Sequence, residues 1–148
     1  MIKIIIDYQV KSFKRLFAKC DIVNSIFFKK FYRNDITDMS YMFSGCTLLE
    51  ELNLSNFNTN NVTNMSEMFI NCSCLKELNL SNFNTSNVTN MNNMFSYCSS
   101  LKELNLSNFN NNNVTHMNGM FDGCSDELKN IIKTQNGRKF KKYFKNDE

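Results

Sequence analysis

The phrase "NLSNFNTNNVTNMSEMF" at residues 53–69 returns almost unchanged as "NLSNFNTSNVTNMNNMF" at residues 79–95. The same shift of 26 residues aligns apolar side chains over most of the chain, without insertion or deletion. A fixed period of this length is typical of proteins whose structural units stack on one another. The aligned columns are Ile36, Val62, Val88 and Val114; Met39, Met65, Met91 and Met117; Met42, Met68, Met94 and Met120; Phe43, Phe69, Phe95 and Phe121; Leu49, Leu75 and Leu101; Leu52, Leu78 and Leu104; Leu54, Leu80 and Leu106; and Phe57, Phe83 and Phe109.

One segment of each unit carries apolar residues at helical spacing. Val62, Met65, Met68, Phe69 and Cys72 recur at intervals of three and four residues. This spacing predicts one buried face of a short helix of about two turns. A threonine hydroxyl is expected to cap the start of each helix. The capping residues are Thr37, Thr63, Thr89 and Thr115.

A second segment of each unit alternates like a strand. In "ELNLS", which occurs at residues 51–55, 77–81 and 103–107, two leucines alternate with glutamate, asparagine and serine. A period of two predicts a short strand with its leucines facing inward and its polar side chains facing outward.

One strand and one short helix cannot bury both of their apolar faces alone. Stacked units can, because their strands pair in parallel, their helices line the other side and their apolar columns merge into one core. The sequence therefore predicts an α/β solenoid, a stack of 26-residue coils that each contain a strand and a short helix, with a parallel sheet on one face.

The boundaries of the units follow from the same register. Stepping back by 26 residues from Cys46 reaches Cys20, so the repeat begins near residue 10. After Cys124 the register fails and the chain becomes basic, as expected of a terminal cap. The expected segments are an N-terminal edge strand or cap (1–9), a degenerate repeat (10–35), three repeats (36–61, 62–87 and 88–113), a partial repeat (114–125) and a basic C-terminal cap, expected to be helical (126–148).

Asparagine is expected to supply hydrogen bonds where the chain leaves each strand. The sequence has no proline and only four glycines, so asparagine and aspartate must make the tight turns. Turning backbone needs polar partners wherever it is buried. We therefore predict that Asn56, Asn82 and Asn108 bond backbone groups of neighbouring coils as a ladder.

The segment "CSCLKELNLSNFNTSNVTNMNNMFSYC" at residues 72–98 resembles the BspA-like leucine-rich repeats, in the subtype written "LxLSNFxTxxVTxMxxMFxxCxxL". The resemblance is close over residues 36–125 and weak over 10–35. It implies a leucine-rich-repeat-like solenoid, found typically in large surface or secreted proteins of bacteria and some parasitic protists that adhere to host or matrix proteins.

Neither catalysis nor a metal site is expected. Five cysteines share one column of the apolar face and are interpreted as small core residues. His116, the single histidine, occupies an outward column, and the sequence contains no nucleophile, phosphate-loop or metal motif around it. We therefore expect no enzyme activity, no catalytic residue, no cofactor and no metal. The core cysteine column is Cys20, Cys46, Cys72, Cys98 and Cys124.

Charge is distributed unevenly along the chain. Residues 1–35 carry eight Lys/Arg and three acids, residues 36–126 carry two and eight, and residues 127–148 carry seven and three. Basic ends can attract nucleic acid or anionic membrane. The tail "GRKFKKYFKNDE" is interpreted first as a cap over the last coil, with Phe140 and Phe144 covering its apolar end.

The leading functional hypothesis is a non-enzymatic module for protein–protein interaction or adhesion, whose partner is another protein. The alternative is a structural spacer whose basic termini bind nucleic acid or anionic membrane. The N-terminus is too short an apolar stretch for a signal peptide or membrane span, which predicts an intracellular protein, whereas the family resemblance implies the cell surface or secretion. The outward columns that would face a ligand are Glu51, Glu77 and Glu103; Asn53, Asn79 and Asn105; and Ser55, Ser81 and Ser107.

Overall fold

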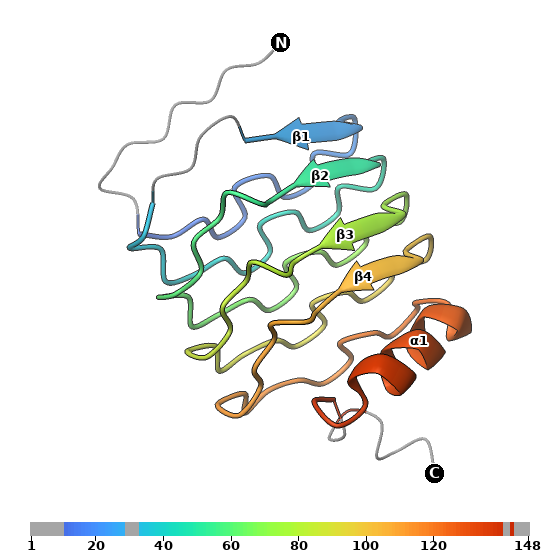
Figure 1. Ribbon diagram of the computed structural model, residues 1–148. Coiled ribbons are helices and arrows are strands. Elements are labelled where there is room, and N and C mark those ends of the chain that lie inside the picture. Colours follow the sequence, from blue (N-terminus) through green and yellow to red (C-terminus); the bar gives the residue numbers. More distant parts are fainter. Residues whose placement is uncertain (1–10, 29–32, 141–142, 144–148) are drawn as a thin grey trace.

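The computed structural model describes residues 11–28, 33–140 and 143, and the edge strand or cap expected at 1–9 lies outside them. In Figure 1 the short strands lie side by side, and a helix follows beside the last of them. Among the described residues, no helix has the length and apolar character needed to cross a membrane. The elements are β1 (Ser25–Phe27), β2 (Glu51–Asn53), β3 (Glu77–Asn79), β4 (Glu103–Asn105) and α1 (Asp126–Asn136).

The strands pair in parallel at the period of the sequence repeat. β1 pairs with β2 and β3 pairs with β4, so that Leu78 lies opposite Leu104, and β2 contacts β3. Leu78 and Leu80 are buried while their polar neighbours point outward, because successive side chains of a strand face opposite sides. The prediction of short parallel strands spaced by 26 residues is confirmed, although each strand has three residues.

The opposite side of each unit is built from turns, and the prediction of a short helix there is wrong. In the unit that begins at Val62, alternate backbone N–H groups donate to carbonyls of the next unit at N···O distances of 2.8–3.0 Å. Local turns are closed by N–H groups between them, such as that of Ile70, which donates to the Glu67 carbonyl at 3.3 Å. An α-helix would instead send every N–H back four residues. The donors to the next unit are Met65, Glu67, Phe69 and Asn71.

Left-handed backbone explains why these segments cannot be helical. Glu67 and Asn71 have φ values of 56° and 61°, which lie outside the right-handed helical region. The same two columns have positive φ in every unit, so the chain changes direction twice in each of them. A run of such turns still places one apolar side chain inside at intervals of three or four residues, which is why the spacing resembles that of a helix. The columns are Arg15, Tyr41, Glu67, Asn93 and Gly119, and Lys19, Gly45, Asn71, Tyr97 and Gly123.

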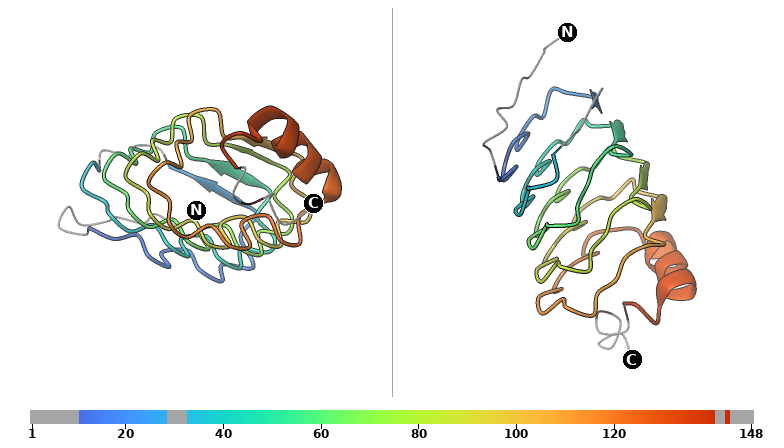
Figure 2. Two further views of the ribbon diagram at one scale, coloured as in Figure 1. Left: turned by 90° about the horizontal axis from the view of Figure 1, so that it is seen from below. Right: turned by 60° about the vertical axis from the view of Figure 1, so that its left-hand side comes forward.

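The threonines predicted as helix caps bridge units instead. Thr63 Oγ1 donates to the Thr37 carbonyl at 3.2 Å, and Thr89 Oγ1 donates to the Thr63 carbonyl at 3.2 Å. Asn82, in the predicted asparagine ladder, bonds as expected, since its Nδ2 donates to the Leu54 and Phe57 carbonyls at 3.1 and 3.0 Å. Polar side chains thus join consecutive units, whose stacking Figure 2 shows from two further directions.

The core is a set of side-chain columns that run through all units. The rings of Phe17, Phe43, Phe69, Phe95 and Phe121 stack with centroids 5.6–5.7 Å apart and planes within 6° of parallel. Such contacts add to the gain from burying the rings themselves. Because every unit contributes a ring from the same position of its repeat, the stack fixes the rotation of one unit relative to the next.

The C-terminal residues close the end of the core. Ser125 caps α1 by accepting the Leu128 N–H, and α1 buries Leu128 and Ile132. After α1, Phe140 is fully buried, and its ring meets the last ring of the stack, Phe121, edge-on at 5.8 Å. Because the Phe140 ring is turned by 87° from that of Phe121, the parallel stack ends here. Phe140 covers the end of the core where a further unit would otherwise pack.

The left-handed turns yield a stability test at Asn71, whose column contains glycine in other units. In the left-handed region, alanine is disfavoured relative to glycine by roughly 1–2 kcal/mol. We expect Asn71→Ala to be less stable to urea than Asn71→Gly by about 1 kcal/mol. At Asn130, exposed within α1, the order should reverse, since glycine costs about 1 kcal/mol in a helix. If alanine were more stabilising than glycine at both positions, the left-handed backbone at Asn71 would be refuted.

Candidate functional site

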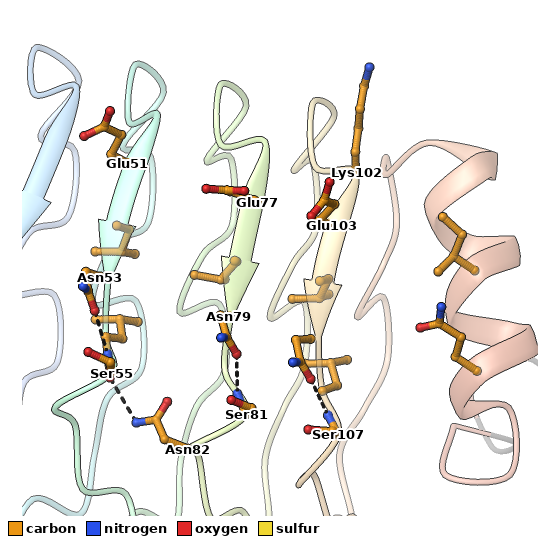
Figure 3. Close-up of a pocket in the computed structure, with 18 of the residues that line it drawn as sticks. Glu51, Asn53, Ser55, Glu77, Asn79, Ser81, Asn82, Lys102, Glu103 and Ser107 are labelled. Atoms are coloured by element: carbon orange, nitrogen blue, oxygen red, sulfur yellow. Dashed lines mark hydrogen bonds between the residues drawn. The ribbon is translucent and has the colours of Figure 1, made fainter.

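The candidate site is the outward side of β1–β4, which we call the strand face. Figure 3 shows its glutamate, asparagine and serine side chains in three parallel columns across neighbouring strands. All nine residues proposed from the sequence lie on this face, eight of them exposed and Ser81 half-buried. The structure brings all nine together, because they line a single groove of about 1200 Å³.

Two residue groups close the groove at its ends. At the β1 end stands Phe27, whose side chain is 66% exposed. At the other end, Ile131, Gln135 and Asn136 of α1 form a wall beside β4. The groove is therefore lined by both polar side chains and leucines of the strand segments, with an apolar residue at each end.

Hydrogen bonds to the backbone orient the asparagine column. The side-chain oxygens of Asn53 and Asn79 accept the N–H groups of Ser55 and Ser81 at 2.9 and 3.0 Å, and Asn105 repeats the contact. This arrangement commits the amide oxygen to the protein. The amide nitrogen, which is only a donor, is left to face a ligand.

The strand face is negatively charged. Glu77 and Glu103 are register partners on adjacent strands, and such strands lie about 4.8 Å apart. The ion pairs found among the described residues are Arg33–Asp35 and Lys129–Asp126, and neither includes a glutamate of the groove. Lys102 is the one cation among the described groove residues. Like charges in register repel, so the face favours a cationic ligand.

The cysteine column lies inside the core. Cys46, Cys72, Cys98 and Cys124 are buried, and Cys20 is half-buried. Each buried thiol donates to the carbonyl of a phenylalanine in the preceding unit at 3.1–3.2 Å. Burial raises the pKa of Cys46 and Cys124 to about 11 and raises the pKa of Cys72 and Cys98 well above the usual thiol value. Thiols held in the neutral form are poor nucleophiles.

The remaining chemical groups do not converge. Within residues 11–28, 33–140 and 143, no three His, Cys, Asp or Glu side chains gather as a metal ligand set would. His116 is exposed, with its Nδ1 atom 2.8 Å from Thr115 Oγ1. The backbone of His116 forms a β-bridge with Asn90, the last in a row of bridges that join the turn sides of the units. This position lies away from the groove.

The basic tail makes structural contacts where it is described. Lys139 Nζ donates to the Ser107 carbonyl, and Asn111 Nδ2 donates to the Lys139 carbonyl. Tyr143 packs edge-on against Phe121 and donates its hydroxyl to Asp122 at 2.9 Å. Phe144, expected to share the capping, lies outside the described residues. The described aromatic residues of the tail therefore pack on the repeat units.

Sequence reasoning missed both ends of the groove. Phe27 pairs with Asn53, so the repeat register places an aromatic ring in the asparagine column. The sequence of the degenerate first unit therefore contains a signal for this end of the groove. The α1 wall has no comparable signal, because the register ends at Cys124 and the direction of the following helix depends on tertiary packing.

The buried thiols make stability depend on alkaline pH. The unfolded chain ionises its thiols near about pH 8.5, whereas the folded chain keeps Cys46 and Cys124 protonated up to about 11. Their contribution to the free energy of unfolding is fully present below about pH 8.5 and declines as the pH rises toward 11. Urea unfolding at about pH 8 and about pH 10 should show a smaller decline for the double variant Cys46→Ala/Cys124→Ala than for the parent chain.

Cys74, a half-buried thiol outside the column, provides the control. Cys74→Ala measures the effect of losing a thiol outside the column. An equal decline in the parent and the double variant would show that burial of these two thiols is not its cause.

A family model described as "Mycoplasma protein of unknown function, DUF285" matches residues 11–135 of the chain. The match includes all four strands and most of α1. No curated protein and no solved structure matches the chain.

Proposed function

The chain belongs to the DUF285 family, and we propose that it is a non-enzymatic protein-binding module that uses the strand face to hold its partner. We further propose that its units form a leucine-rich-repeat-like solenoid of the BspA-like kind. Support for the solenoid comes from the 26-residue period, the parallel strand pairs and the bridges that join Ser12, Asp38, Asn64, Asn90 and His116.

The observation that carries the proposal is the groove along the strand face. It gathers repeated polar side chains from β2, β3 and β4 between Phe27 and α1. Rigid elements that present an open, repetitive surface suit binding of an extended partner, as in other stacked-repeat proteins. The groove contains one exposed aromatic residue and no arginine among its described residues, and these residue types dominate strong interfaces. We therefore expect modest affinity, reinforced by multivalency.

A non-catalytic role agrees with the placement of the reactive groups. The buried thiols have raised pKa values inside the core, and His116 lies outside the groove. The alternative role, a spacer with basic ends that bind nucleic acid or membrane, receives less support. Phe140 is buried against Phe121, so this aromatic residue of the tail is used to cover the core.

A neutral, bulky substitution tests whether the strand face binds proteins. Asn79→Tyr places a ring in the middle of the groove without changing its charge, and Asn130→Tyr makes the same change on an exposed position of α1 that does not line the groove. We expect Asn79→Tyr to lose the proteins that the parent chain captures, as measured by quantitative mass spectrometry, while Asn130→Tyr retains them.

Circular dichroism should first establish that both variants are folded. Capture of the same proteins in the same amounts by the parent and by Asn79→Tyr would overturn the proposed function.

A further inference from the structure

We propose that the partner segment held by the strand face is a basic peptide in the polyproline II conformation, with Lys or Arg at every third position. This inference rests on the proposed function and specifies the chemistry of its ligand. It follows from the charge of the groove, the spacing of its columns and the hydrogen-bonding groups that its floor presents.

Charge selects a cationic ligand. Glu51, Glu77 and Glu103 form one exposed column along the groove, and Glu50 lines it as well. Neither ion pair found among the described residues involves them, and Lys102 is the single described cation beside them. A ligand with positive side chains relieves the repulsion between register partners such as Glu77 and Glu103.

Spacing selects the conformation of the ligand. β3 pairs with β4, and β2 contacts β3 without pairing with it. With the spacing of paired strands, about 4.8 Å, taken for both steps, the glutamate column spans about 9.6 Å from Glu51 to Glu103. A polyproline II helix advances about 9.3 Å in three residues and then presents the same face again. A β-strand repeats its face after about 6.8 Å, and an α-helix repeats its face at each turn of about 5.4 Å, so that two turns span about 10.8 Å. The polyproline II repeat therefore lies closest to the distance from Glu51 to Glu103 across the intervening strand.

The other columns suit the backbone of such a ligand. Polyproline II segments make no internal hydrogen bonds, so their carbonyl groups are available as acceptors. The asparagine column offers amide N–H donors, because the oxygens of Asn53, Asn79 and Asn105 already accept backbone N–H groups. Phe27, 66% exposed at the β1 end of the groove, offers a ring face to a proline, as aromatic residues do in other grooves that bind such segments.

Fluorescence anisotropy with synthetic peptides tests the inference on the full chain. The probe is a labelled peptide of repeated Lys-Pro-Ala triplets. One control peptide has glutamate in place of lysine, and another has the same composition with the lysines at alternate positions. We expect the triplet peptide to bind more tightly than both controls and to weaken as salt is added.

Charge removal in the groove supplies the matched variants. Glu77→Gln/Glu103→Gln should weaken binding of the triplet peptide by about fivefold. Glu67→Gln makes the same chemical change outside the groove, where Glu67 accepts the Tyr41 hydroxyl at 2.7 Å, and should bind like the parent chain.

Each outcome distinguishes the inference from the proposed function. Equal binding of the three peptides, or no loss in Glu77→Gln/Glu103→Gln, would overturn the basic polyproline II ligand. If captured proteins were still lost from Asn79→Tyr in that case, the strand face would remain a protein-binding site for a different ligand. If Asn79→Tyr also had no effect on captured proteins, the proposed function would fail as well.

Discussion

Backbone hydrogen bonds between each unit and the next are the interaction on which the rest of the structure depends. The N–H of Phe69 donates to the Met94 carbonyl, and the N–H of Phe43 makes the same bond to Met68 one unit earlier. A bond of this kind requires an identical path in neighbouring units, and the sequence accordingly keeps its period without insertion between residues 36 and 121. Once that path is repeated, stacking of the phenylalanine rings and burial of the thiols follow from position alone.

The same constraint separates the roles of the residues within a unit. Apolar side chains and polar groups such as Thr63 and Asn82 are committed to the core or to the neighbouring unit. The glutamates of the strand face are exposed, and the strands beneath them are already held by backbone pairing. Their repetition therefore produces a regular charged surface, and a regular surface suits a ligand with a repeat of its own.

Much of this arrangement could be predicted from the sequence, and the failures have a physical cause. Alternation in "ELNLS" identifies the strands because a period of two matches a strand and does not match a helix. The spacing around Met65 and Phe69 is ambiguous, since a run of turns buries side chains at nearly the period of a helix. The deciding feature is the left-handed backbone at Glu67 and Asn71. The sequence does not reveal this feature, least of all at Glu67, because glutamate gives no sign of a positive φ. The α1 wall of the groove depends on packing beyond the last repeat and leaves no periodic signal.

The central claim, that each unit is bonded to the next through its turns, is tested most directly by identifying hydrogen-bond partners in solution. NMR scalar couplings across hydrogen bonds can identify the carbonyl that accepts the N–H of Phe69. Bonding between units predicts a coupling between the Phe69 nitrogen and the carbonyl carbon of Met94, in the next unit. A coupling from Phe69 to Met65, four residues earlier as in an α-helix, would contradict it.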